Sequence, residues 1–138
     1  MTLSKFFIFL YSILSLQLFA LLLDCISLLL LFLSLILSLY ITFSVGRKFD
    51  KLFRDINPVF LPDLGWYNAV LRSICYARLI ASKNRLMPKK IYKERYGDFD
   101  FYGSASPLQR KACVLYFVFA LLSLILVIVA LSIMKLTS

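Results

Sequence analysis

A nearly uncharged apolar run, Phe6–Val45, is the feature that most constrains how this chain can fold. Asp24 is its one charged residue, and Gln17 is its only other strongly polar side chain. A second apolar run, Ala112–Met134, follows later in the chain. Hydrophobic residues make up 62% of the 138 residues, whereas soluble domains hold roughly 45–50%. The sequence therefore predicts an all-α integral membrane protein, in which lipid covers the surplus apolar surface.

The first run is too long to cross a bilayer once at right angles. As one helix it would measure about 60 Å, twice the thickness of the hydrocarbon core. Residues 25–46 predict a transmembrane helix. Residues 1–24 are either an N-terminal apolar extension of it or a first membrane segment, paired with it in a hairpin that would raise the spans from two to three. The sequence beside Asp24 lacks Gly, Pro and Asn, which favours one continuous helix. A cleaved signal peptide is disfavoured, because no small-x-small site follows.

A basic segment, residues 47–111, joins this helix to a second transmembrane helix over residues 112–134, which residues 135–138 follow as a tail. The segment holds 14 of the 16 Lys and Arg residues and six of the seven acids, a net charge of +8. Basic residues near membrane ends favour the cytoplasmic side. We therefore expect a multi-pass protein with a cytoplasmic, largely helical basic segment.

Apolar residues at helical spacing predict two amphipathic helices within the basic segment. One continues the first transmembrane helix over Phe49–Ile56, and Asn57-Pro58 should end it. The other covers Trp66 to about Arg85, and Pro88 should separate it from the next piece. Ser106-Pro107-Leu108-Gln109 is a capping box with Pro at the first helical position. It predicts that the last helix begins there, before the membrane, and carries Arg110 and Lys111 at headgroup height.

Basic residues interleaved with tyrosines mark a candidate contact surface in this segment. Basic and aromatic side chains can bind nucleic acid by stacking. Beside a membrane they are more typical of a patch for anionic lipid headgroups. We therefore expect a bilayer with anionic headgroups as partner, and no nucleic acid. The predicted headgroup or partner surface consists of Arg72, Arg78, Lys89, Lys90, Tyr92, Lys93, Arg95 and Tyr96.

Small and hydroxyl side chains share one face of each predicted transmembrane helix. Such side chains let helices approach closely in lipid. We expect the two faces to meet each other, or to meet a membrane-protein partner or a second copy. The alternative is that each hydroxyl bonds to its own backbone one turn back. The predicted packing stripe consists of Ser27, Ser34, Ser38, Thr42, Ala120, Ser123 and Ala130.

No sequence pattern predicts a catalytic, cofactor or metal site. The chain has no His, and Cys25, Cys75 and Cys113 are widely separated, which is typical of free thiols. Asp24 is expected near the end of a span, where a carboxylate costs little. Asp98-Phe99-Asp100 resembles an Asp-x-Asp metal motif but has no third carboxylate nearby.

The first function hypothesis is a non-catalytic membrane protein that acts through helix packing and its basic surface. An accessory subunit of a larger membrane complex is one alternative. A lipid-handling enzyme or transporter component that uses Asp24, or Asp98 and Asp100, is the other. The absence of clustered ionisable groups favours the first hypothesis.

A diffuse motif extends over the segment and the second span. A membrane helix runs into Arg47-x-x-x-x-x-x-Arg54-x-x-x-Pro58, and Gly65, an Arg/Tyr-rich helix, Tyr96-x-Asp98 and Arg110-Lys111 follow. This pattern resembles the universal stress protein B family of small bacterial inner-membrane proteins. Residues 1–21 would then be an addition to the usual length. The resemblance implies a bacterial inner-membrane protein linked to stress or stationary phase, and it transfers no catalytic residue.

Overall fold

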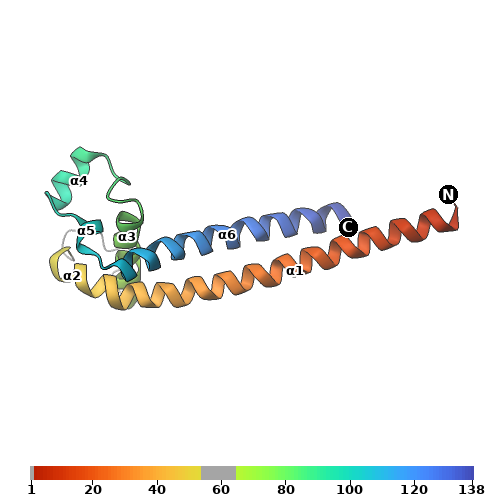
Figure 1. The fold of residues 1–138 in the computed structure, drawn as a ribbon, viewed down its shortest axis with the longest axis horizontal. Helices are drawn as coiled ribbons and strands as arrows, with labels where there is room; N and C mark the ends of the chain where they lie inside the picture. Colours follow the sequence, from red (N-terminus) through yellow and green to blue (C-terminus); the bar gives the residue numbers. More distant parts are fainter. Residues whose placement is uncertain (1, 54–64) are drawn as a thin grey trace. The chain divides into compact units, whose positions relative to one another are not determined.

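The structure is a computed structural model that describes residues 2–53 and 65–138 (Figure 1). Apart from short connections these residues are helical. In chain order the elements are α1 (Leu3–Ile41), the π-helical turn η1 (Thr42–Gly46), α2 (Arg47–Phe53), α3 (Gly65–Ala81), α4 (Lys89–Tyr96), α5 (Phe101–Ser104) and α6 (Pro107–Thr137).

The first helix is unbroken from α1 through η1 to α2, a length of 51 residues. It passes through Asp24 without a turn. The hairpin, and with it the three-span alternative, is therefore wrong, and the continuous helix favoured by the missing turn residues is confirmed. Leu3–Phe53 and Pro107–Thr137 are both long and apolar enough to cross a membrane. They measure about 75 Å and 45 Å along their axes.

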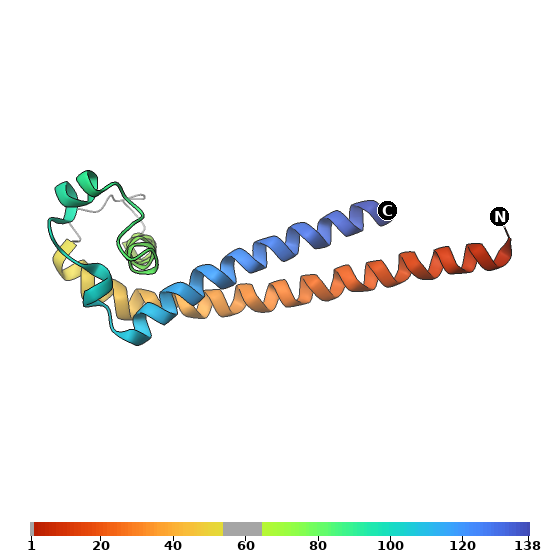
Figure 2. The same cartoon turned by 45° about the horizontal axis from the view of Figure 1, so that its top comes forward.

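The chain divides into two compact units, and α1 and α6 contribute to both. The smaller unit is Met1–Leu33 with Val118–Ser138, and the larger unit is Ser34–Phe117. Within the smaller unit α1 and α6 run antiparallel, side by side, as two views show (Figures 1 and 2). Only 17% of the most apolar stretch of the first helix and 11% of that of α6 is buried in the protein. Most of their apolar side chains thus face outward.

The larger unit has a hydrophobic core of its own. There α3 packs on η1 and α2, and α5 packs on α3. The core is rich in aromatic rings, which supply much buried area per residue. Its buried members are Ile41, Val45, Phe49, Phe53, Tyr76, Ala77, Leu79, Ile80, Tyr96, Phe101, Ala105 and Cys113.

Two predicted helices of the basic segment are present, with one boundary shifted. The helix continues through α2 to Phe53, while the stop predicted at Asn57-Pro58 lies outside the described residues. α3 ends at Ala81 instead of about Arg85. Lys83 and Asn84 adopt left-handed backbone angles, with φ of 53° and 64°, and the Asn84 N–H donates to the Leu79 carbonyl at 2.8 Å. Asn tolerates this conformation better than most residues.

The capping box before α6 is confirmed. The Gln109 N–H donates to the Ser106 hydroxyl oxygen at 3.2 Å, and the Ser106 N–H donates to the Gln109 side-chain oxygen at 2.9 Å. The Gln109 amide also donates to the Ser44 hydroxyl at 2.8 Å. Gln109 therefore takes part in the cap at the start of α6 and also binds α6 to η1 within the larger unit.

η1 approaches α3 most closely at Gly46. A Cβ there would lie 2.0 Å from the Ser73 Oγ and 3.1 Å from the Ser73 Cβ. The hydroxyl can rotate away, but the Cβ is fixed by the α3 backbone. We expect the clash in Gly46→Ala to cost about 1–3 kcal/mol, of which better helix propensity returns up to about 1 kcal/mol.

Thermal unfolding in detergent measures this net loss, and Gly65→Ala is the matched control. Among the described residues, nothing lies within 4 Å of a Cβ at Gly65, so that substitution should be neutral or slightly stabilising. Equal melting of the two variants would contradict the tight contact between η1 and α3.

Candidate functional site

An aromatic cluster centred on Phe101 organises the larger unit. Phe101 is fully buried, and six other rings have centroids 4.9–6.3 Å from its own. The pairs are edge-to-face, tilted or, for Tyr76, stacked, and aromatic pairs are favourable beyond the area that they bury. The cluster ties α2, α3, α4 and α5 to one another. The six rings are Phe49, Phe53, Tyr76, Tyr92, Tyr96 and Phe99.

Asp100 places Phe101 by capping the short helix α5. The Gly103 N–H donates to its Oδ1 at 2.9 Å, and the Asn84 side-chain amide donates to the same oxygen at 2.5 Å. These two bonds lower the pKa of Asp100 below its ordinary value, and the bond from Gly103 has the larger effect. The Asp-x-Asp motif is thus a helix cap. Within residues 2–53 and 65–138, no group of three His, Cys, Asp or Glu side chains could hold a metal ion, and the three cysteines are free.

A partly buried ion pair fastens α2 to α3. The Arg72 Nε and Nη2 atoms each donate to a separate Asp50 carboxylate oxygen at 3.0 Å. The Tyr76 hydroxyl donates to Asp50 Oδ1 at 2.9 Å. The hydrogen bond with Asp50 raises the pKa of Arg72. Arg72 was predicted on the headgroup surface, but its side chain is only 8% exposed. That prediction is corrected, because the buried guanidinium is already occupied by Asp50.

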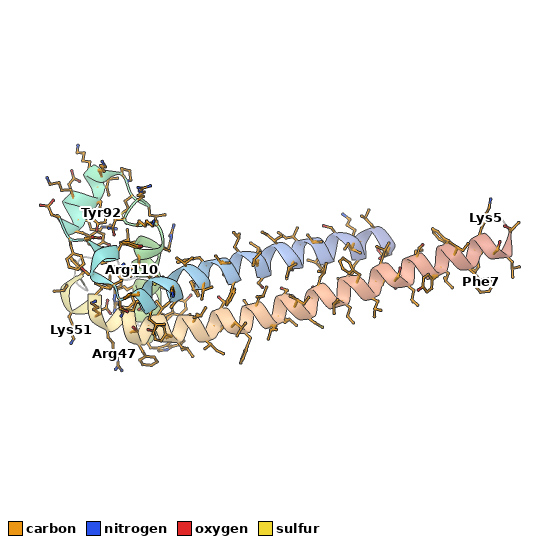
Figure 3. All side chains as sticks on the ribbon, in the orientation of Figure 1. Lys5, Phe7, Arg47, Lys51, Tyr92 and Arg110 are labelled. Carbon is orange, nitrogen blue, oxygen red and sulfur yellow. The ribbon has the colours of Figure 1, made fainter. Side chains whose placement is uncertain are left out.

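The tyrosines predicted on the same surface also face inward. Tyr96 is buried. Tyr92 is half-buried, and its ring points from α4 toward α5 (Figure 3), where its centroid lies 6.3 Å from that of Phe101. The Tyr92 hydroxyl donates to the Phe99 carbonyl. Four residues apart, the two rings share the inner face of α4, so they are core residues and unavailable for stacking on a ligand.

The remaining residues of the predicted headgroup surface are exposed. They lie on the outer sides of α3 and α4, where their charges meet the surroundings. They are Arg78, Lys89, Lys90, Lys93 and Arg95.

Burial of the two tyrosines makes the stability of the larger unit depend on pH in the alkaline range. Loss of hydration raises the pKa of Tyr92 and Tyr96 above the ordinary value of 10.0. The unfolded chain therefore ionises first, and we expect stability to hold below about pH 10 and to fall as pH rises through that value. Unfolding midpoints measured from pH 8 to 11 test this. If the double variant Tyr92→Phe/Tyr96→Phe loses as much stability between pH 8 and 11 as the unchanged chain, the two hydroxyls are not the cause of the loss.

The predicted packing stripe is resolved into two kinds of residue. In the smaller unit the Ser27 hydroxyl donates to the Ser123 carbonyl at 3.0 Å, and the Ser123 hydroxyl donates to the Ser27 carbonyl at 3.1 Å. Ala130, one heptad after Ser123, is fully buried. So is Ala20, one heptad before Ser27, which the stripe omitted although the spacing pointed to it. A seven-residue repeat is the signature of helices that coil about each other.

The other stripe residues do not all share this role. Ser34, which lies in the larger unit, is buried. The Ser38 hydroxyl donates to the Leu35 carbonyl at 2.7 Å and the Thr42 hydroxyl to the Ser38 carbonyl at 2.8 Å. For these two the backbone alternative holds. Ala120 is partly exposed.

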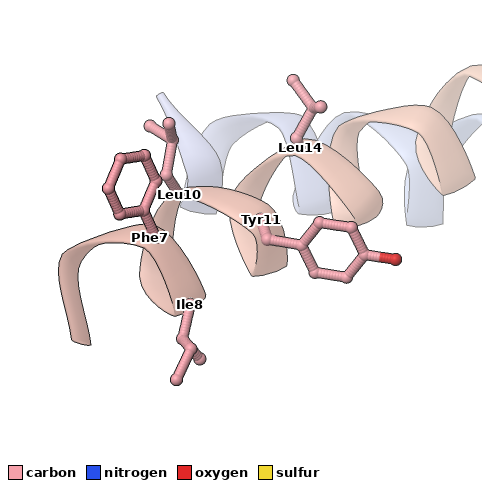
Figure 4. Close-up of a pocket in the computed structure, with 5 residues that line it drawn as sticks. All are labelled: Phe7, Ile8, Leu10, Tyr11 and Leu14. Atoms are coloured by element: carbon pink, nitrogen blue, oxygen red, sulfur yellow. The ribbon is translucent and has the colours of Figure 1, made fainter. Parts of the chain in front are cut away.

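The N-terminal turns of α1 carry an almost wholly apolar hollow of about 500 Å³ (Figure 4). All of its lining residues come from one helix, so it is a groove on an exposed helix surface and not a cleft between elements. Its polar group is the Tyr11 hydroxyl. It offers hydrophobic contact but no chemistry. The lining residues are Phe7, Ile8, Leu10, Tyr11 and Leu14.

A hollow of about 440 Å³ in the larger unit has a different character, because basic and apolar residues line it together. Arg110 and Lys111, expected at headgroup height, are two of them. Lys83 and Tyr102 join them, and neither had a sequence signal, since they are placed by the left-handed turn after α3 and by the cap of α5.

No known protein family, curated protein or solved structure matches this chain. The resemblance to the universal stress protein B family stays a prediction. A function for the chain therefore depends on its own geometry.

Proposed function

We propose that this chain is a non-catalytic, two-span membrane protein that acts through helix packing and presents its basic segment to anionic headgroups. One observation carries the proposal: in the paired helices, small polar side chains face inward and large apolar side chains face outward, the reverse of a water-soluble protein. Small and hydroxyl residues such as Ser27 and Ser123 lie between them, while Leu, Ile and Phe side chains face outward. In lipid, helix association depends on such close contacts and interhelical hydrogen bonds.

Charge supports a cytoplasmic basic segment. Arg47, Lys48 and Lys51 follow the first apolar stretch directly, and Figure 3 shows Arg47 and Lys51 pointing away from the neighbouring helices. Arg110 and Lys111 stand just before the second stretch. Basic residues close to both membrane ends favour the cytoplasmic side. With the resemblance stated above, the proposed location is the inner membrane of a bacterium, in a stress-linked role.

Two acids of the basic segment have structural roles and give little support to catalysis. Asp50 is paired with Arg72, and Asp100 caps α5. Both carboxylates are engaged by neighbouring groups of the unit, and the segment as a whole carries a net charge of +8, which suits attraction to anionic lipid.

Membrane extraction tests the proposal. The full chain should stay in the membrane fraction through alkaline carbonate and urea washes and leave it with a mild detergent. A cysteine placed at Lys51 in a chain without native cysteines should react with an impermeant maleimide only after the cytoplasmic side is opened. Release by urea, or labelling of intact cells, would overturn the proposal.

Helix packing is tested by Ser27→Leu. A leucine in the buried seam forces α1 and α6 apart and removes the paired hydroxyl bonds. We expect a loss of about 2–4 kcal/mol, from overpacking of about 1–3 kcal/mol and hydrogen bonding of about 0.6 kcal/mol or more. Ser15→Leu is the matched control, since Ser15 is exposed and its hydroxyl donates to the Ser12 carbonyl of the same helix, at 2.8 Å. Disulfide trapping between cysteines placed at Ala20 and Ala130 reports the separation of α1 and α6. Equal trapping in both variants would contradict the close contact of the two helices at Ser27.

One observation favours the alternative of an accessory subunit. With Ser27 beside Ser123 in an antiparallel pair, Lys135 lies level with about residue 15, at equal rise per residue. The exposed apolar turns before it, from Phe6 to Tyr11, therefore extend past the end of α6. The mass and composition of the particle extracted in mild detergent test this alternative. Other subunits in the particle would favour an accessory subunit, and a monomer or small homo-oligomer would exclude one.

A further inference from the structure

The hollow beside Tyr102 combines fixed positive charge with an apolar wall. We propose that it binds the phosphate of an anionic phospholipid, with the start of an acyl chain along α6. The inference rests on the proposed function, because it needs the larger unit at the membrane surface. Its lining residues are Ala81, Lys83, Tyr102, Arg110, Lys111, Val114 and Leu115.

At the polar end of the hollow, two cationic side chains lie against the same aromatic ring. The Arg110 guanidinium carbon lies 4.4 Å from the centre of the Tyr102 ring, and the Lys83 Nζ lies 5.7 Å from it. The two charges are therefore no more than about 10 Å apart, within reach of one phosphate once the flexible lysine moves. The ring attracts each cation without neutralising it.

Arg110 is held in place by the backbone. Its Nε donates to the Tyr102 carbonyl at 2.8 Å, and its Nη2 donates to the Gly103 carbonyl at 3.1 Å. A guanidinium has five N–H donors, so these two bonds fix its position and leave donors for an anion. Arg110 acts electrostatically on Asp100, whose Oδ1 already accepts bonds from Gly103 and Asn84. Lys83 and Lys111 form no ion pair within the described part of the chain.

The opposite side of the hollow is apolar. Ala81 ends α3, while Val114 and Leu115 are exposed on α6. Leu115 leads directly into the uncharged part of α6, which runs to Met134. A phosphate with a hydrocarbon chain satisfies both ends, whereas a soluble phosphate would leave the apolar wall in contact with water.

The hollow at α4 shows why the more basic stretch is the weaker candidate. Lys89 and Lys93 line it, but so do Asp98 and Asp100. Its charges balance, and no aliphatic side chain lines it. An anion gains little there, although α4 is the most basic helix. The predicted lipid contact at Lys89 and Lys93 is therefore replaced by one at Lys83 and Lys111.

The test uses the full chain, purified in a neutral detergent. Native mass spectrometry counts bound phosphatidylglycerol against phosphatidylcholine, and titration with dihexanoyl-phosphatidylglycerol gives an affinity. Lys83→Gln/Lys111→Gln should weaken phosphatidylglycerol binding about tenfold. Lys89→Gln/Lys93→Gln removes the same charge and should change it less than about threefold. Lys83→Arg should retain binding, which separates loss of charge from loss of fold, and Arg110 is left intact because it supports the backbone.

Each remaining outcome overturns the inference. Equal losses in both double variants would mean diffuse attraction without a site. No loss in either would exclude the hollow. Inorganic phosphate that competes as well as the lipid would assign the site to a soluble phosphate. A chain that resists urea extraction and prefers phosphatidylglycerol to phosphatidylcholine, but loses that preference equally or not at all in the two double variants, refutes this inference alone and leaves the proposed function intact.

Discussion

Phe101→Ala should lower the free energy of unfolding of the larger unit by about 3–5 kcal/mol. The side chain is fully buried, and the rings around it come from α2, α3, α4 and from Phe99, just before α5. Truncation leaves a cavity that these rings cannot close together, because each is fixed by its own helix. We therefore expect α4 and α5 to lose their place while the long helices persist.

The readout must report tertiary packing, since helix content in detergent will change little. Near-ultraviolet circular dichroism and the rate of Cys75 labelling are suitable, because Cys75 lies half-buried on α3. Phe43→Ala is the matched control. Phe43 is 59% exposed and makes a cation–π contact with Arg47 at 4.9 Å, so its loss should cost about 1 kcal/mol or less. Similar melting of the two variants would show that Phe101 is not the centre of the core.

Local features of the fold could be predicted from the sequence. The apolar runs set the two long helices, because their length and lack of charge leave few alternatives. The missing turn residues beside Asp24 indicated that the first helix continues. Ser106 and Gln109 located the start of α6, since a capping box satisfies backbone donors within a single turn. Each of these signals acts between residues close in sequence.

The errors concern residues whose roles depend on distant partners. Tyr92 and Tyr96 alternate with lysines, and this pattern is the same for a surface that stacks on ligands and for an amphipathic helix with an aromatic inner face. Arg72 looked like one more surface cation, because nothing local shows that Asp50, 22 residues earlier, pairs with it. Sequence spacing gives the face of a helix but not what covers it.

The packing stripe shows the same limit. A helical wheel groups Ser27, Ser34, Ser38 and Thr42 on one face, yet only the first two are buried. The buried residues of the seam recur every seven residues, which is the spacing typical of helices that coil about each other. Its register, set by Ser27 against Ser123, spans 96 positions of the chain. Neither the π turn at Gly46 nor the hollow at Tyr102 has a local signature.

Asp50→Asn should destabilise the larger unit by about 2–4 kcal/mol. Removing one member of a buried pair costs about 3–5 kcal/mol, because the other charge stays buried without compensation. The expected value is lower here, since the Asp50 side chain remains 20% exposed. The cost cannot be relieved by deprotonation, because an arginine keeps its charge at any practical pH. Asp98→Asn, at an exposed acid of the same unit, should change stability by about 0.5 kcal/mol or less.

A double-mutant cycle separates the pair from its surroundings. Arg72→Met alone leaves the Asp50 carboxylate with the Tyr76 hydroxyl and should cost less than Asp50→Asn, since that carboxylate is nearer to water. Asp50→Leu/Arg72→Met replaces both charges with apolar groups of similar size, and such replacements are often neutral. We expect the double variant to melt above either single variant. If the losses simply add, Asp50 and Arg72 do not depend on each other, and α2 and α3 are joined by the aromatic cluster alone.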